Sequence, residues 1–444
     1  MSFASHRARI AGLALAAGLL VLPAGAAAVD YPPPSKPAAK PSPPKGPFKT
    51  ITVCKAGKPK GCAKTIQAAV DKAKPGDTIK VPNGTYNEQV AINGKAKRYL
   101  KLIGNPKAPE KVVLDGKGKK NNGVIVTGAD GVTINGFHAT RYAANGFFLR
   151  GVNGYTLTNL RATLAGVYGL YAFNSIGGTM SNSTGAWNSD SAFYVGQTPP
   201  QTKPVRTQLK NLTDYGNLLG YSGTNSRYVT ISGSRFYNNG AGIVPNALDS
   251  EKYPPAEDNV FTNNEVFWNN FNYYKGAPWK ARETSVNGSI PFPVGVGILL
   301  FGGRGNKVTG NKVYGNYLGG VALVQALTLK NAAVDGTLKN NQVTGNTFGE
   351  GGQDPNGVDI AYTGDGSGNC FENNTGAAVT VPADAGGFPT CAALGTGANT
   401  PNDAALATMI GWATAADHEA GWVRGPHVTK AGITPLETYT GGAK

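Results

Sequence analysis

The chain has 444 residues, of which 62 are glycine, 29 are proline and only 15% are charged. This composition argues against a helical bundle and favours many short strands joined by tight turns, so one long all-β domain fits the length. The net charge is +16, and the excess lies at one end: residues 36–120 contain 20 lysines and arginines against 5 acidic residues, while residues 121–444 contain 20 of each.

The basic segment favours an anionic partner, such as an acidic polysaccharide or an anionic cell-envelope polymer. A lysine-rich surface that serves only solubility is the competing interpretation. We expect no nucleic acid partner, because the N-terminus indicates export. There, basic residues precede an apolar run at Ile10–Leu22 and small residues follow up to Ala28, which is the order of a secretory signal peptide.

We therefore expect residues 1–28 to be a signal peptide and the mature protein to be secreted, with attachment to the cell surface as an alternative. No other run is long enough to span a membrane. Residues 29–48, rich in proline and lysine, are expected to form an extended linker.

The four cysteines fall into two local pairs, which predict disulfides Cys54–Cys62 and Cys370–Cys391 in an oxidising compartment. A zinc site is the alternative. It is disfavoured, because neither pair has two-residue spacing and the histidines do not cluster beside them.

A helix is predicted at Thr65–Lys74, where apolar residues recur at helical spacing before a Pro-Gly stop. Strand-like runs follow at Thr78–Val81 and Gln89–Ile92, separated by a Pro-Asn-Gly turn. The sequence from Thr65 to Tyr86 resembles the N-terminal cap of the pectin-lyase-like superfamily. The resemblance extends over residues 50–391 and implies a single right-handed parallel β-helix, but no particular activity.

From Ile134 onward the sequence repeats with a base period of 22 or 23 residues, which fits one coil of such a solenoid. We assign the central apolar residue of successive coils to Ile134, Leu157, Met180, Leu209, Ile231, Val260, Val308 and Leu338. Eight residues after five of these positions stand asparagines, which we expect to stack as a ladder at one turn: Asn188, Asn217, Asn239, Asn316 and Asn346.

The strand after that turn opens with a small residue. Because strand side chains alternate, the next residue points into the coil and the one after it points outward. The predicted inward positions are Phe147, Leu170, Phe193, Ile243 and Ile298. The predicted outward positions in three successive coils are Phe148, Tyr171 and Tyr194, with Arg150 and Phe173 at the next outward step.

Rings at a strand spacing of about 5 Å can lie against successive sugars. We therefore predict that Phe148, Tyr171, Phe173 and Tyr194 bind a polysaccharide. The alternative is that inserted loops cover these rings and form a small second core. Insertions at residues 196–206, 245–258 and 270–296 flank this strand and are expected to wall a groove over it.

Six residues on this strand and in the loops are candidate catalytic groups: Asp190, Tyr194, Arg150, Lys203, Arg206 and Asp249. A lyase needs a base beside a uronic carboxylate and cations that neutralise that carboxylate. A glycosidase instead needs two carboxyls, which Asp190 with Asp249 or Glu251 can supply.

No catalytic residues are carried over from the superfamily. Its pectate lyases gather several aspartates on the groove face for calcium, whereas Asp359 is the one carboxylate assigned to that face here. Its polygalacturonases carry Asn-Thr-Asp, Asp-Asp and Gly-His-Gly motifs, and none of these occurs in the sequence. We therefore predict no cofactor and no metal, since calcium lacks a carboxylate cluster.

The sequence thus predicts a β-helix over residues 49–392 and a C-terminal cap over residues 393–444, with a helix at Asp403–Ala416. Two functions remain open. One is a secreted carbohydrate-active enzyme, lyase or glycoside hydrolase, that acts on an acidic polysaccharide. The other is a non-catalytic extracellular protein that binds polysaccharide or serves as an adhesin.

Overall fold

The computed structural model describes residues 34–36, 41–54, 61–272, 277, 285–286, 290–351, 354–384, 387–393 and 399–414. The predicted signal peptide therefore lies outside the described residues, as do parts of the linker and most of the C-terminal segment. All described residues belong to the second of two units, Tyr31–Lys444. Within them, no helix combines the length and apolarity needed to cross a bilayer.

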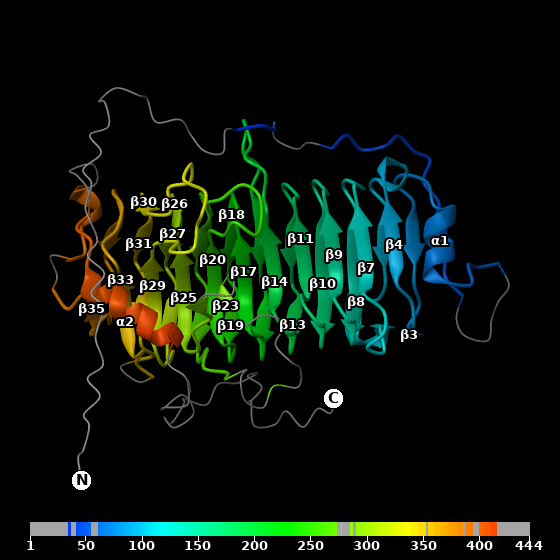
Figure 1. The fold of residues 1–444 in the computed structure, drawn as a ribbon. Helices are drawn as coiled ribbons and strands as arrows, with labels where there is room; N and C mark the ends of the chain where they lie inside the picture. The colour runs from blue at the N-terminus through cyan, green and yellow to red at the C-terminus, as the bar shows by residue number, and fades with distance from the viewer. Residues whose placement is uncertain are drawn as a thin grey trace, which may run out of the picture. The chain divides into compact units, whose positions relative to one another are not determined.

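The Tyr31–Lys444 unit is a right-handed parallel β-helix, as predicted (Figure 1). One sheet takes a single strand from each of eleven coils. Its strands are β4 (Val90–Asn93), β7 (Asn122–Thr127), β9 (Asn145–Arg150), β11 (Leu170–Phe173), β14 (Ser191–Gly196), β17 (Leu219–Thr224), β20 (Ala241–Asn246), β25 (Val296–Phe301), β29 (Gly319–Val324), β33 (Val358–Tyr362) and β35 (Thr380–Val381). We call it the eleven-stranded sheet.

The remaining long-range pairing forms a 20-stranded parallel sheet. Its strands are β1 (Thr50–Thr52), β2 (Thr78–Lys80), β3 (Gly84–Tyr86), β5 (Lys101–Ile103), β6 (Val112–Asp115), β8 (Thr133–Thr140), β10 (Thr156–Thr163), β12 (Thr179–Ser181), β13 (Thr184–Ala186), β15 (Thr207–Lys210), β16 (Thr213–Tyr215), β18 (Val229–Ser232), β19 (Arg235–Tyr237), β21 (Val260–Thr262), β22 (Glu265–Phe267), β27 (Lys307–Thr309), β28 (Lys312–Tyr314), β31 (Gln342–Thr344), β32 (Thr347–Phe348) and β34 (Cys370–Glu372). Two short pairs complete the strands: β23 (Ser285–Val286) with β24 (Ile290–Pro291), and β26 (Gly303–Arg304) with β30 (Leu338–Lys339).

The predicted register holds for the first five assigned coils, where Ile134, Leu157, Met180, Leu209 and Ile231 are paired in succession. Two later assignments are wrong. Ile231 pairs with Phe261 instead of Val260, because Phe261 is the residue of that strand with no exposed surface. Val308 pairs with Val343, because Leu338 belongs to β30 at the preceding turn.

The asparagine ladder is confirmed for four of its five predicted members. The Nδ2 atom of Asn188 donates to Asn217 Oδ1 at 3.0 Å, and Asn217 Nδ2 donates to Asn239 Oδ1 at 2.9 Å. The ladder continues through Asn269 to Asn316 and Asn356. Asn346 was misassigned together with Leu338, and it lies in a parallel ladder formed by Asn264, Asn311, Asn346 and Asn374.

The alternation of side chains on the eleven-stranded sheet is also as predicted. All five predicted inward residues, from Phe147 to Ile298, have no exposed surface. The small residue before each is explained by close approach of the coils. A Cβ atom on Gly169 would lie 2.5 Å from the Ala192 carbonyl oxygen of the next coil.

Helices and disulfides secure the two ends. At the N-terminal end, α1 (Ile66–Lys72) is capped by Thr65, whose side chain accepts from the Ala68 amide. The 3-10 helices η1 (Lys95–Lys97), η2 (Pro109–Lys111) and η4 (Cys391–Ala393) are short. Both predicted disulfides, Cys54–Cys62 and Cys370–Cys391, are present.

The C-terminal helix is present as α2 (Asp403–Thr414), within the predicted Asp403–Ala416. It lies across the outward face of the last coils, where Met409 shares an apolar cluster with Val296 and Ala361 (Figure 1). The described parts of the linker contact the coils as well. Lys36 pairs with Gln201, and the Tyr99 hydroxyl donates to the Pro41 carbonyl.

Candidate active site

A cleft of about 540 Å³ opens over the outward face of β11, β14, β17 and β20. Four of the sequence-predicted site residues line it, namely Tyr171, Phe173, Asp190 and Tyr194. Glu251, which the sequence offered as an alternative partner carboxyl for Asp190, lines it too. Alternation on the strands and the loop at residues 245–258 therefore bring aromatic and acidic groups into one cavity.

The aromatic residues form a connected group along this face. The Phe148 and Tyr171 rings are stacked, with centroids 4.5 Å apart and planes 13° from parallel. Tyr171 meets Tyr194 edge-on at 4.8 Å and Phe173 at 5.7 Å. Tyr194 is buried, with 1% of its surface exposed, whereas the other three rings are half-buried. The loop thus covers Tyr194 but leaves part of the group open to a ligand.

The loop at residues 245–258 is held down by side chains of neighbouring coils. Asn225 Nδ2 donates to the carbonyls of Leu248 and Glu251, both at 2.8 Å. Gln197 Oε1 accepts from the Lys252 amide at 3.0 Å. These bonds place the Glu251 side chain against Tyr194, whose hydroxyl donates to Glu251 Oε1.

The environment of Glu251 suits proton transfer. Burial raises the pKa of Glu251 to about 7, and the negative charge of Asp190 acts in the same direction, while the hydrogen bond from Tyr194 opposes both. Burial, together with the charge of Glu251, raises the pKa of Tyr194 well above its ordinary value. Tyr194 therefore remains a hydrogen-bond donor, and Glu251 exchanges a proton near neutral pH, which is the property of a general acid or base.

Asp190 enters the cleft from the turn before β14. Its backbone amide donates to the Val167 carbonyl and its carbonyl accepts from the Leu219 amide, both at 3.1 Å. These contacts with the two adjacent coils fix the turn. Its side chain is half-buried and close enough to Glu251 for the two charges to interact. The cleft thus holds two interacting carboxyls, of which Glu251 has a raised pKa.

The other predicted catalytic residues lie outside the lining of the cleft. Arg150 is exposed and is paired with Phe173 on the adjacent strand, so it stands one coil away. Arg206 donates to the Asp258 carbonyl at 2.7 Å, and Lys203 is exposed in the same loop. Asp249 is exposed and accepts from the Lys330 amide. Among the described residues, the cleft lining contains no lysine or arginine.

Comparisons with known proteins find similar structures but no related sequences. No family model matches the sequence, and a search of curated proteins finds no relative. The chain is similar to the A-module of mannuronan C-5 epimerase AlgE4 from Azotobacter vinelandii, with a TM-score of 0.44 and 15% identity over 69% of this chain and 87% of that one.

Two further solved structures are also similar to this chain. Pectate lyase Pel9A has a TM-score of 0.42 and 15% identity, covering 77% of this chain and 83% of its own. An alginate lyase from Paenibacillus sp. strain FPU-7 has a TM-score of 0.35 and 16% identity, covering 67% of this chain and 94% of its own. Identities this low carry no information about the residues of the cleft.

Sequence reasoning missed several lining residues. Tyr168 lies two residues before the β11 strand, and its ring centroid is 4.6 Å from that of Tyr171 and 4.5 Å from that of Tyr194. Its place in a turn gave no signal of direction. Ser222 and Asn246 are outward residues of β17 and β20 and could have been assigned by the same alternation that identified Tyr194.

The described residues contain no group of three or more histidine, cysteine, aspartate or glutamate side chains that could hold a metal ion. Asp359, the carboxylate considered for calcium, is buried and bonded to its surroundings. It accepts from Asn356 Nδ2 at 3.0 Å and from the backbone amides of Ala378 and Val379 at 2.8 and 3.1 Å. Asp359 therefore serves a structural role, because it joins β33 to the backbone of the next coil.

Proposed function

We propose that this protein is a secreted carbohydrate-active enzyme that binds a polysaccharide over the aromatic face and hydrolyses a glycosidic bond in the cleft. The observation that carries the proposal is a pair of carboxyls, Asp190 and Glu251, that line one cleft beside partly exposed aromatic rings, with the pKa of Glu251 raised to about 7. Two carboxyls with distinct protonation are what glycoside hydrolysis requires.

The two carboxyls take different roles. Glu251 holds its proton to higher pH because it is buried, so it acts as the general acid that protonates the leaving oxygen. Asp190, which lines the same cleft, is the second carboxyl that the reaction requires. Tyr194 is a positioning residue, because its hydroxyl donates to Glu251 and sets the direction of that side chain.

Hydrolysis is favoured over elimination by the charge of the lining. A lyase neutralises the uronic carboxylate beside the proton that it removes, commonly with lysine or arginine. The described lining of this cleft has neither, and it carries two acids of its own. At the cleaved bond, this lining therefore suits a neutral sugar, or one whose carboxylate is bound by hydrogen-bond donors and not by a cation.

An acidic polymer remains the expected substrate class, because basic residues lie outside the cleft, toward the N-terminal coils, where the rest of a long polymer would bind. Arg150 is exposed one coil beyond Phe173, and residues 36–120 carry the basic excess of the chain. The same basic residues favour the second candidate function, a non-catalytic protein that binds an anionic polymer. Two disulfides support secretion for either function.

The test is incubation with uronate and neutral polysaccharides, with separate assays for new reducing ends and for ultraviolet-absorbing unsaturated ends. We expect reducing ends without unsaturation. Glu251→Gln and Asp190→Asn should each lower the rate by about 100-fold or more, while Asp71→Asn, which alters an exposed carboxyl on α1, should not.

Other outcomes separate the candidates. Unsaturated products would identify a lyase. Binding without cleavage, weakened by Tyr171→Ala, would identify a binding protein that uses the same face. Neither binding nor cleavage of any polymer would contradict the assignment of the cleft to carbohydrate.

A further inference from the structure

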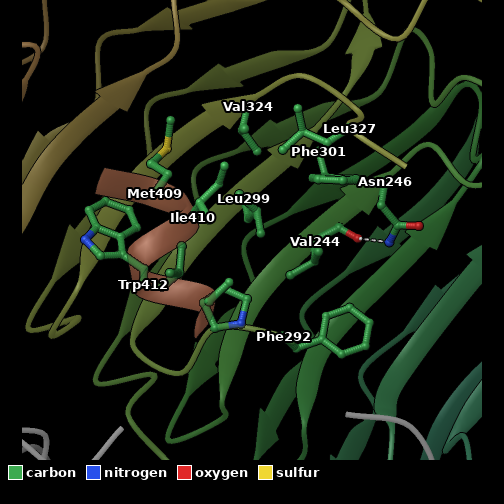
Figure 2. A pocket seen from close by; sticks show the side chains of 13 residues that line it. Val244, Asn246, Phe292, Leu299, Phe301, Val324, Leu327, Met409, Ile410 and Trp412 are labelled. Atoms are coloured by element: carbon green, nitrogen blue, oxygen red, sulfur yellow. Dashed lines mark hydrogen bonds between the residues drawn. The ribbon is translucent and has the colours of Figure 1, made fainter. Parts of the chain in front are cut away.

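Figure 2 shows a second, small and apolar pocket. It has a volume of about 50 Å³ and lies between α2 and the outward face of β20, β25 and β29. Asn246 and Phe292 line both the pocket and the cleft, so the two spaces are adjacent. The other contacts of the pocket are almost entirely hydrocarbon, including those from Val244, Leu299, Val324, Met409 and Trp412.

The size of the pocket limits its occupant. An apolar cavity of about 150 Å³ holds benzene, with its six carbon atoms, so about 50 Å³ holds two or three non-hydrogen atoms. A sugar ring is too large. A lone hydroxyl is unsuited, because burial without a partner costs about 1–3 kcal/mol. An acetyl group has the right size, provided that its apolar methyl enters the pocket and its carbonyl oxygen stays at the side of the cleft.

Asn246 supplies the polar atom at the junction. Its Nδ2 donates to the Val244 carbonyl at 3.1 Å. Its Oδ1 is buried and accepts no hydrogen bond from the described residues. Figure 2 shows the nitrogen turned toward Val244 and the oxygen on the other side of the amide. An unpaired buried acceptor is costly, and a ligand N–H would satisfy it.

We infer that the pocket binds the acetyl group of an acetylated sugar whose ring lies in the cleft, and that Asn246 favours an acetamido group over an acetyl ester. The inference rests on the proposed function, because it places a sugar beside Asp190 and Glu251. It adds a substrate class to that function: glycans that carry acetyl substituents.

The experiment compares polymers that differ in an acetyl substituent and carry the same charge. Chitooligosaccharides are tested against cello-oligosaccharides, which have a neutral hydroxyl in place of the acetamido group, and acetylated xylan and polygalacturonate against the same polymers after mild alkali. Affinity and cleavage are both measured. Burial of the acetyl methyl and carbonyl carbon predicts binding about tenfold tighter than for the unacetylated partner.

Two variants test the pocket itself. Leu299→Phe, at a half-buried position, and Val244→Phe should fill the space and remove the preference, while retaining the affinity for the unacetylated chain. Val379→Phe, on a residue that is 48% exposed and absent from the lining, is the matched control and should keep the preference. The use of two variants guards against a folding defect in either one.

The outcomes are distinguishable. If the wild-type protein cleaves polymers without regard to acetylation, and Glu251→Gln abolishes cleavage, the inference fails and the proposed function stands. A preference for acetyl esters alone would overturn the role of Asn246. Absence of binding and cleavage in every arm would overturn both the inference and the proposed function.

Discussion

Replacement of Glu251 by glutamine removes a carboxyl whose protonated form the folded chain favours. Burial raises the pKa of Glu251 from 4.5 to about 7. Below pH 4.5 the folded and unfolded chains both carry this proton, and above pH 7 both have released it. Between these values the folded chain binds more protons than the unfolded chain, so the stability contributed by Glu251 is lost as the pH rises.

The magnitude follows from the shift. A difference of about 2.5 pH units at about 1.4 kcal/mol per unit gives a loss of about 3 kcal/mol. Glutamine cannot titrate and retains an acceptor for the Tyr194 hydroxyl. Glu251→Gln should therefore match the wild type at pH 4.5 and exceed it by about 3 kcal/mol at pH 8.5, or about 4 °C in Tm for a solenoid of this size.

Urea unfolding followed by tryptophan fluorescence, repeated across this pH range, measures the difference. The comparison of two variants isolates Glu251 from other titrating groups, since these are common to both chains. Asp71→Asn, at an exposed carboxyl of α1, is the control and should give a profile parallel to the wild type. Parallel profiles for Glu251→Gln and wild type would refute the reasoning.

Three further results are expected. Asn239→Ala removes a fully buried amide that donates to Asn269 and Asp214, and should lower the free energy of unfolding by about 2–4 kcal/mol in urea titrations. Replacing Cys370 and Cys391 by serine frees a link across 21 residues, and should cost about 3 kcal/mol, with faster hydrogen exchange in the last coils. Affinity for a long acidic polymer should fall as salt rises from about 50 to about 500 mM, whereas affinity for a trisaccharide confined to the cleft should change little.

The sequence was sufficient to predict the fold because the coil repeats its own constraints. Small residues such as Gly169 stand where coils approach closely, and the following residue is apolar because it points into the core. The prediction failed where an insertion separates coils. The Leu338 position is apolar and buried like the true register residue Val343, so hydrophobicity alone could not separate the two.

The site was predictable only in part. Strand alternation identified the outward column that contains Tyr171 and Tyr194, because it depends on local geometry. The choice between Asp249 and Glu251 as the second carboxyl of the cleft does not depend on local geometry. It depends on the two hydrogen bonds from Asn225 that turn Glu251 toward Tyr194, and Asn225 lies 26 residues away in the chain. A contact of that range has no signature in residue spacing.

The exposure of the outward face of the eleven-stranded sheet also limits where a polysaccharide can bind on it. Phe148 and Tyr171 are half-buried, Tyr194 is covered by the loop of Glu251, and Ala322 has no exposed surface in the apolar cluster that includes Met409 of α2. On the proposed function, a bound polysaccharide extends from the cleft toward the N-terminal coils, since α2 covers the other direction. Residues 36–120 begin that end of the solenoid and carry the basic excess. Charge and shape thus favour the same path for an acidic chain, and they place the proposed cleavage near one end of it.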